Sequence, residues 1–289
     1  MTVASGAPRA EERFIDLDDV RLRALIEGEG EPILVLHGFT GCAESMQSVA
    51  TSLRERFRVI RLDLIGHGGS EAPASEAVYS MSRCAGQIVE AVERLDLGRP
   101  HLLGYSMGGR AAIAAAVAAP ERFSSLVLIG ATAGIRDDAL RDARIEADRA
   151  LAERIERDGV EAFVDAWMAL PIFATQSRLG DAALAEAREE RLRNRPIGLA
   201  NSLRGMGAGA QMPLFDRLET FSPPVLLVVG DEDAKFREIA RSLETLFPDA
   251  RTAILADSGH ATHLEAPRAF ADVVSAFLAD VSARDRMSA

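Results

Sequence analysis

The sequence predicts an α/β fold in which helices cover both faces of a mostly parallel β-sheet. Short apolar runs recur along the chain and alternate with segments whose apolar residues have helical spacing. Strands that are apolar on both faces are typical of parallel sheets covered by helices. The chain has 289 residues and is 48% hydrophobic, which is enough for one large core, so we expect a single domain. The expected strands are residues 32–36, 57–64, 101–103, 126–129, 225–229 and 252–255.

Periodicity and helix-ending residues predict the remaining elements. Residues 14–25 alternate between apolar and polar side chains, which predicts a half-exposed pair of strands. Residues 82–97 have apolar side chains at helical spacing, and Gly98 and Pro100 end this helix. An alanine-rich helix is expected at 110–119, and a closing helix is expected at about 267–279.

The strand pattern stops between Thr132 and Gln211. This stretch is charged, has helical periodicity and contains Trp167, the one tryptophan of the chain. It is too long for a loop without structure of its own. We therefore expect a helical lid at residues 132–210, inserted into an α/β core of residues 14–131 and 211–282. Residues 1–13 are expected as an N-terminal extension.

Composition limits the partners of the protein. The net charge of −11 argues against nucleic acid, because phosphates attract a basic surface. The longest apolar run, residues 111–119, is too short to cross a membrane, and residues 1–13 lack the apolar stretch of a signal peptide. The two cysteines, Cys42 and Cys84, are expected as free thiols. We expect a cytoplasmic protein without membrane or nucleic-acid partners, and the sequence gives no indication of its oligomeric state.

The residues Gly104-Tyr105-Ser106-Met107-Gly108 match the pattern G-x-S-x-G between a predicted strand and a predicted helix. In that context the pattern is typical of a sharp turn that presents a reactive serine. A serine hydroxyl becomes a nucleophile or a base only when a neighbouring group takes its proton. Ser106 is therefore the candidate catalytic residue.

His260, after the last predicted strand, is the candidate partner of Ser106. The acid should follow the preceding strand, where Asp233 is our choice and Asp231 the alternative. The chain order serine, acid, histidine is that of the α/β-hydrolase fold. The other histidines are expected to be structural, and no third ligand accompanies His260 and His263, so we expect no metal site. Those structural histidines are His67, His101 and His263.

An oxyanion hole is expected beside Ser106. The His37-Gly38-Phe39 segment follows the first core strand, at the position that supplies one backbone donor in this fold. The N–H groups of Phe39 and Met107 could together stabilise a developing negative charge.

Several segments together resemble one family, the menaquinone-pathway synthases that make 2-succinyl-6-hydroxy-2,4-cyclohexadiene-1-carboxylate. The resemblance extends from about residue 30 to 270. Its HG, G-x-S-x-G and GH parts occur throughout the α/β-hydrolase superfamily, whereas Arg110 after two glycines, the run at 203–207 and Asp-x-Lys-Phe at 233–236 are more specific. The matching positions are 36–41, 63–68, 104–110, 167, 171–174, 202–207, 230, 233, 235–236 and 259–260.

The resemblance implies a lyase without a cofactor. That family eliminates pyruvate from 2-succinyl-5-enolpyruvyl-6-hydroxy-3-cyclohexene-1-carboxylate by removing a proton beside a ketone. Ser106, with its proton held by His260, would then act as the base. The electrons of the broken C–H bond would spread onto the ketone oxygen at the oxyanion hole.

The resemblance also implies cationic side chains around a small tricarboxylate substrate. Arg110 lies one helical turn beyond Ser106 and could bind a carboxylate with two parallel hydrogen bonds. Arg144 and Arg191 align with lid arginines of the family, although Arg141 and Arg193 lie close by and a solvent-facing role stays open for each. All basic residues except Lys235 are arginine, so an arginine alone is weak evidence. Tyr105 and Trp167 are expected to line the pocket, with a core role as the alternative for Trp167.

Two other functions stay open at this point. An esterase or a carbon–carbon bond hydrolase of the same fold would use Ser106 as a nucleophile and pass through an acyl-enzyme. A ligand-binding protein without catalysis would not require serine, acid and histidine together. The pattern around Arg110 and the lid favours the lyase.

Overall fold

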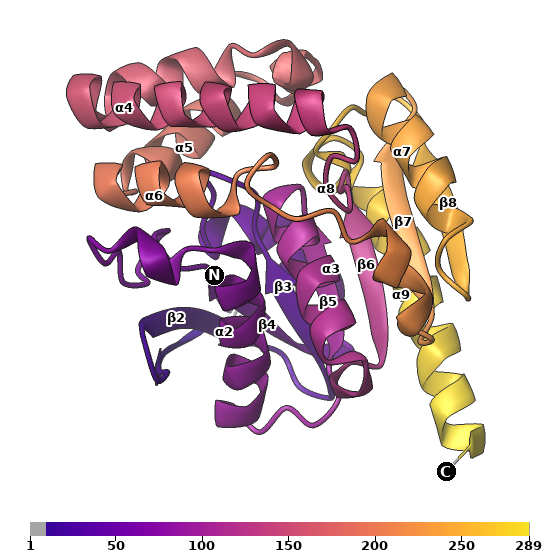
Figure 1. Ribbon diagram of the computed structural model, residues 1–289. Coiled ribbons are helices and arrows are strands. Elements are labelled where there is room, and N and C mark those ends of the chain that lie inside the picture. The colour runs from indigo at the N-terminus through magenta and orange to yellow at the C-terminus, as the bar shows by residue number, and fades with distance from the viewer. Residues whose placement is uncertain (1–9, 289) are drawn as a thin grey trace, which may run out of the picture.

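The computed structural model describes residues 10–288 and contains an eight-stranded sheet of order β1-β2-β4-β3-β5-β6-β7-β8. Strands β1 and β2 are antiparallel additions at one edge, and the other six are parallel (Figure 1). The predicted α/β class is therefore confirmed. The strands are β1 (Glu11–Asp16), β2 (Arg21–Glu27), β3 (Glu31–Leu36), β4 (Phe57–Asp63), β5 (His101–Tyr105), β6 (Ser125–Ile129), β7 (Val225–Gly230) and β8 (Ala250–Leu255).

The first strand begins earlier than the sequence predicts. Glu11 pairs with Ile26 and Arg13 with Ala24, so residues 11–13 belong to the sheet and not to an extension. Alternation alone did not reveal this, because this end of β1 is exposed on both faces. The other residues of the expected extension, 1–9, lie outside the described part of the chain.

Helices cover both faces of the sheet because strand side chains alternate in direction. In β3, Leu34 and Leu36 pack into the larger core with α2, α3 and α7, whereas Ile33 and Val35 pack with α1 and α9 on the other face. Two expected boundaries differ: α3 begins at residue 107, and α9 continues to residue 288. These helices are α1 (Gln47–Leu53), α2 (Met81–Arg94), α3 (Met107–Ala118), α7 (Ala234–Glu244) and α9 (Pro267–Ser288), with the short α8 (Thr262–Glu265) preceding α9.

The stretch between β6 and β7 is helical and lies across one end of the sheet (Figure 1). Gly159 interrupts its longest helix, because its φ of 86° and ψ of 172° are not helical. The stretch has a small core of its own, in which Ile155, Phe163 and Leu199 are buried. Its elements are α4 (Asp138–Met168), the 3₁₀ helix η4 (Pro171–Leu179), α5 (Asp181–Leu192) and α6 (Pro196–Met206). The remaining 3₁₀ turns are η1 (Glu44–Met46), η2 (Glu76–Val78), η3 (Pro120–Arg122) and η5 (Phe215–Thr220).

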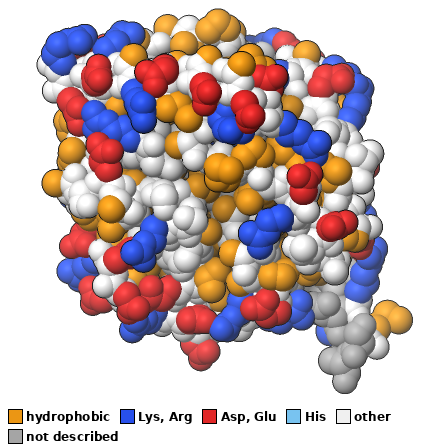
Figure 2. All heavy atoms as spheres, in the orientation of Figure 1, with side chains coloured by type: hydrophobic (Ala, Val, Ile, Leu, Met, Phe, Trp, Pro, Cys, Tyr) orange, Lys and Arg blue, Asp and Glu red, His pale blue; other side chains and the backbone are white. Residues whose placement is uncertain are grey.

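The outer surface of this helical layer carries charges of both signs (Figure 2). Apolar side chains gather below α4, along the seam between the helical layer and the sheet (Figure 2). Among the described helices, none combines the length and the apolar character that crossing a membrane would require.

Candidate active site

Ser106 lies in the turn between β5 and α3, in a backbone conformation that side chains rarely adopt (φ 51°, ψ −107°). Glycines make this turn sterically feasible. A Cβ on Gly104 would lie 2.4 Å from the carbonyl oxygen of Gly108, and a Cβ on Gly108 would lie 2.4 Å from that of His37. The G-x-S-x-G pattern thus has the strand–turn–helix context that gives it meaning.

Ser106, His260 and Asp233 form a continuous hydrogen-bonded chain. Nε2 of His260 lies 3.1 Å from Oγ of Ser106, and Nδ1 lies 2.8 Å from Oδ2 of Asp233. The other oxygen of Asp233 accepts the N–H of Phe236 and so caps α7. Asp231, the alternative acid, accepts the N–H of Ser258 instead. The structure therefore brings Asp233, and not Asp231, to the histidine.

This chain of hydrogen bonds can move a proton from the serine. An ionised Asp233 beside Nδ1 favours the tautomer with the proton on that nitrogen, which leaves Nε2 free to accept the Ser106 hydroxyl. His260 is 3% exposed, so little water competes for it. Its ring packs against Phe236, 4.5 Å away between ring centres.

Phe39 and Met107, the expected oxyanion donors, both lie beside the cavity of Ser106. Phe39 follows β3, and Met107 is the first residue of α3, where backbone N–H groups have no partner inside the helix. Both residues line the same cavity as Ser106 and His260. Shared lining of one cavity is compatible with an oxyanion hole at these two N–H groups, which stays a prediction.

The cavity above Ser106 has a volume of about 450 Å³ and lies between the helical stretch and the sheet. Trp167 forms part of its wall and packs edge-on against Phe39, with 5.2 Å between ring centres. Trp167 also packs against the small core of the helical layer. Leu170 and Ile172 line the cavity and are 38% and 37% exposed, so the cavity opens to solvent on their side.

Arg110 lines this cavity and is buried. Its Nη1 donates to the carbonyl oxygen of Met206 at 2.7 Å and to Oε1 of Gln211 at 3.0 Å. Among the described residues, no carboxylate forms an ion pair with it. Burial and the nearby Arg144 lower the pKa of Arg110 to about 10, so it remains a cation at neutral pH. Asp148 interacts with it electrostatically but forms no direct ion pair. A buried cation that lacks a direct ion pair favours the binding of an anion.

Arg144 lies on α4 and faces the same cavity. Its Nε donates to Oδ1 of Asp148 at 2.8 Å, and both side chains line the wall. Burial raises the pKa of Asp148, and its Oδ2 has no partner within the described chain. The pair therefore contributes little net charge, and the charge of Asp148 also acts on Arg110, although the two side chains form no direct ion pair.

Arg191 and Tyr105 occupy a different place from the one we expected. They line a second cavity of about 260 Å³, and Phe39 lies in the wall of both cavities. Nη1 of Arg191 donates to the carbonyl oxygen of Ala187. The structure thus does not bring these two residues into the cavity of Ser106. Their neighbours Arg141 and Arg193 line neither cavity.

The other histidines lie in the core. His263 packs against Tyr105 with 4.7 Å between ring centres, and burial lowers its pKa to about 3. Burial likewise lowers the pKa of His67 to about 3. His101 contacts the hydroxyl groups of Ser124 and Ser125.

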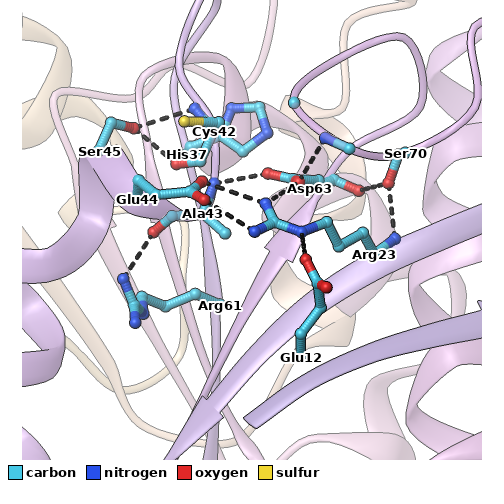
Figure 3. A network of polar contacts seen from close by, with 12 residues as sticks. Glu12, Arg23, His37, Cys42, Ala43, Glu44, Ser45, Arg61, Asp63 and Ser70 are labelled. Carbon is cyan, nitrogen blue, oxygen red and sulfur yellow. Dashed lines mark hydrogen bonds and ion pairs between the residues drawn. The ribbon is translucent and has the colours of Figure 1, made fainter. Parts of the chain in front are cut away.

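Cys42, Glu44 and Asp63 converge below the loop after β3, close enough together to hold a metal ion. Arg23 fills this position instead, donating to Glu44 at 2.7 Å and to Asp63 at 3.0 Å (Figure 3). Burial raises the pKa of the Cys42 thiol and so keeps it protonated. The cluster is therefore an ion-pair network and not a set of metal ligands. Cys42 and Cys84 are free, which confirms the prediction.

Lys235 lines the cavity of Ser106, and sequence reasoning gave it no role. It lies on α7, two residues after Asp233. Among the described residues, no carboxylate pairs with its ammonium group. The signal that could have identified it is its rarity. The chain has 33 basic residues, and only this one is a lysine.

Comparison with known proteins agrees with this geometry. A family model for the α/β-hydrolase fold matches residues 31–267. A protein of Bacillus subtilis (strain 168), provisionally named a 2-succinyl-6-hydroxy-2,4-cyclohexadiene-1-carboxylate synthase, is 42% identical over 91% of this chain and 97% of its own. The synthase of that name from Enterobacter sp. (strain 638) is 31% identical over 86% of this chain and 92% of its own.

A solved structure is similar over almost the same range. The structure of MenH from S. aureus superimposes with a TM-score of 0.84 and 28% identity, covering 90% of this chain and 98% of that chain. Both the family model and the synthase relatives extend over most of the chain. The chain therefore belongs to the 2-succinyl-6-hydroxy-2,4-cyclohexadiene-1-carboxylate synthase family of α/β-hydrolase-fold enzymes.

Proposed function

We propose that the protein eliminates pyruvate from 2-succinyl-5-enolpyruvyl-6-hydroxy-3-cyclohexene-1-carboxylate, with Ser106 as the base. The observation that carries the proposal is the combination of two features in one cavity. The chain Ser106–His260–Asp233 opens into the space where Arg110 is buried and forms no direct ion pair with the described residues. A hydrolase of neutral esters has no use for such a cation, whereas an enzyme for a carboxylate-rich substrate does.

The proton transfer follows from the hydrogen bonds. Nε2 of His260 takes the proton of the Ser106 hydroxyl, and the serine oxygen removes the proton from the ring carbon beside the ketone. The electron pair of that C–H bond moves onto the ketone oxygen, where the N–H groups of Phe39 and Met107 stabilise it. No bond forms between serine and substrate.

The second half of the reaction expels the leaving group. The electron pair returns from the ketone oxygen and forms the ring double bond C2=C3. The double bond that was at C3=C4 shifts to C4=C5, and the bond between C5 and the enolpyruvyl oxygen breaks. That group leaves as the enolate of pyruvate and takes up a proton, which replaces the one removed from the ring. The products are the cyclohexadiene and pyruvate. The ring proton has already restored the serine hydroxyl, and His260 releases the proton it holds, which balances the proton that the leaving group takes up.

Recognition of a tricarboxylate needs more than one cation, and the cavity supplies three. Nη2 and Nε of Arg110 donate to none of the described residues, so one planar edge of the guanidinium remains open for a bidentate carboxylate. Among the described residues, Lys235 forms no ion pair, whereas Arg144 is paired with Asp148 through its Nε atom. We assign these three residues to the carboxylates. Arg191 and Tyr105 could take part only from the second cavity, and their role in binding stays a prediction.

The helical stretch, with boundaries at residues 132 and 210, acts as the lid in this proposal. It supplies Arg144 and Trp167 to the wall and separates the reacting atoms from bulk water. We also place the protein in the cytoplasm, because two buried free cysteines suit a reducing compartment.

The deciding experiment compares two activities of one preparation. We expect rapid release of pyruvate from the enolpyruvyl substrate and feeble hydrolysis of p-nitrophenyl acetate. Ester hydrolysis without release of pyruvate would transfer the function to the serine hydrolase alternative, in which Ser106 attacks carbon. The absence of both activities would favour a ligand-binding protein.

A further inference from the structure

His37 is a buried histidine that the proposed reaction does not use. It is 0% exposed and follows directly after β3. Its two ring nitrogens have partners of opposite kind. The backbone N–H of Leu64 points to Nε2 at 3.1 Å, and the carbonyl oxygen of Gly38 lies 2.8 Å from Nδ1.

These partners leave one tautomer. A backbone N–H can only donate, so Nε2 of His37 must accept and carries no proton. The ring proton of the neutral form is therefore on Nδ1, and it is donated to Gly38. Burial lowers the pKa of His37 to about 4, which keeps the ring neutral above that pH.

The carbonyl that receives this proton belongs to the amide whose N–H is that of Phe39. All described peptide bonds are trans, and in a trans amide the N–H points opposite to the C=O. The N–H of Gly41 donates to the same oxygen at 3.0 Å. Two donors thus hold the C=O on the inner side of the loop and aim the N–H of Phe39 outward.

The Gly38–Phe39 segment lies beside the nucleophile. A Cβ built on Gly38 would lie 3.6 Å from Cβ of Ser106 and 2.8 Å from the Tyr105 ring. The amide therefore lies against the Ser106 turn, and Phe39 itself lines the reaction cavity. Donation to the carbonyl oxygen also polarises the amide and strengthens its N–H as a donor.

The end of β4 also holds this loop through the polar contacts of Asp63 (Figure 3). Leu64, the donor to His37, follows directly after Asp63 in the chain. Oδ1 of Asp63 accepts the N–H of Ala43 at 2.5 Å, and Arg23 neutralises its other oxygen. The loop between β3 and α1 is thus attached to β4 near both of its ends.

We propose that His37 is a positioning residue that orients and polarises the Gly38–Phe39 amide toward the reacting oxygen. The proposal rests on the proposed function only in that the Phe39 N–H must serve an oxyanion. The orientation itself can be measured on the unreacted protein.

The first test uses the wild-type protein and needs no turnover. Nitrogen NMR of ¹⁵N-histidine-labelled protein at pH 7 should show a His37 ring protonated at Nδ1 and bare at Nε2. The Phe39 amide proton should shift when a carboxylate product analogue is added. A His37 ring with its proton on Nε2 would overturn the proposal, whatever the reaction proves to be.

The second test compares two ring replacements. His37→Phe keeps an aromatic ring but removes the donor to Gly38, and we expect kcat to fall by about tenfold to a hundredfold with KM within about twofold. His67→Phe is the matched control, because that ring is equally buried, lies 5.1 Å from His37 and bonds to Ile65 instead. Equal kcat losses in the two variants, or full activity of His37→Phe, would refute the positioning role.

If His37→Phe does not fold, His37→Gln supplies a second comparison, since its amide N–H₂ can reach toward the same carbonyl. We then expect partial activity and a Phe39 amide resonance between those of the wild type and of an unsupported amide. A Phe39 resonance identical to that of the wild type, combined with reduced activity, would contradict the proposal.

Discussion

Nδ2 of Asn194 donates a 2.7 Å hydrogen bond to the carbonyl oxygen of Thr40, which joins the start of the α6 segment to the loop after β3. Its Oδ1 accepts the N–H of Gly68, in the loop after β4. One buried amide therefore connects the helical stretch to the two loops that surround the Phe39 donor. Thr40 has a positive φ of 68°, so this contact also supports a strained backbone.

Replacement of Asn194 by alanine should destabilise the protein and weaken catalysis together. The loss leaves the buried oxygen of Thr40 and the N–H of Gly68 unsatisfied, which costs about 1–3 kcal/mol for each group that water does not reach. Urea unfolding and pyruvate release check the two effects. Asn194→Asp is the informative companion, because it keeps the acceptor for Gly68 and loses the donor to Thr40. A variant as stable and active as the wild type would show that the junction is not held by this side chain.

The hydrogen-bonded chain predicts a large loss on removal of either end. Ser106→Ala and His260→Ala should each lower pyruvate release by at least about a thousandfold, because neither residue can move the proton alone. The thermal unfolding midpoint of Ser106→Ala should stay close to that of the wild type, whereas His260→Ala should be less stable because it removes a buried ring that pairs with Asp233. The double variant should be no worse than the singles. Activity that persists in either single variant would exclude the proposed base.

Arg110 should discriminate between charged and neutral substrates. Arg110→Met removes the buried cation but keeps a side chain of similar length, and kcat/KM for the tricarboxylate should fall by about a hundredfold. Hydrolysis of p-nitrophenyl acetate should change by no more than about threefold. Equal losses on both substrates would instead assign Arg110 to holding the Met206 and Gln211 segment in place.

Lys235 should affect binding more than turnover. Lys235→Met should raise KM for the tricarboxylate by about tenfold with kcat within about twofold, since its ammonium contributes one charge-assisted contact. Arg241→Gln is the matched control, because it removes a positive charge from the same helix where Arg241 pairs with Glu238 on the exposed surface. An equal rise of KM in the control would show a general charge effect, and an unchanged KM in Lys235→Met would remove Lys235 from the site.

Stability should fall as the pH drops below about 6.5. Burial lowers the folded-state pKa of His37 to about 4 and those of His67 and His263 to about 3. The unfolded chain takes up protons at these histidines from about pH 6.5 downward while the folded chain does not, so acid favours unfolding. Each of these histidines should lower the free energy of unfolding by about 2 kcal/mol at pH 5 relative to pH 7.5.

Urea titrations at pH 7.5 and pH 5.0 measure this difference. Removing one of the three ionisable groups by His67→Phe should reduce the dependence on pH by about one third. Equal free energies of unfolding at the two pH values in the wild type would contradict the buried neutral state of these rings.

Local patterns predicted the fold and the reacting groups because each depends on neighbours in the chain. The turn at Ser106 needs its glycines at fixed spacing, and apolar runs in the sequence indicate the strands. The chain order of Asp233 and His260 follows from the order of β7 and β8. In contrast, the choice between Asp233 and Asp231 depends on where α7 begins. The sequence around these two carboxylates does not show which of them the helix places beside His260.

The lid residues were harder to place because their roles depend on packing between distant segments. Arg144 and Arg191 look alike in the sequence, yet Phe39 and the helices divide them between two cavities. Lys235 is the one lysine among 33 basic residues. This rarity indicates no function until the structure places α7 beside the cavity. The two roles of Trp167 also became visible only in the structure. Its ring lines the cavity on one side and packs against the small helical core on the other.

The break at Gly159 divides α4 into two arms that have separate tasks. The arm before it carries Arg144 and Asp148, and the arm after it carries Trp167. Because the helical backbone does not run through the break, a change in length or tilt of one arm need not be transmitted to the other. The charged part of the wall and Trp167 therefore stand on separate helical segments, although both segments pack into the same small core. Exchanging residues 160–168 between relatives would change the surroundings of Trp167 while leaving Arg144 and Asp148 in place.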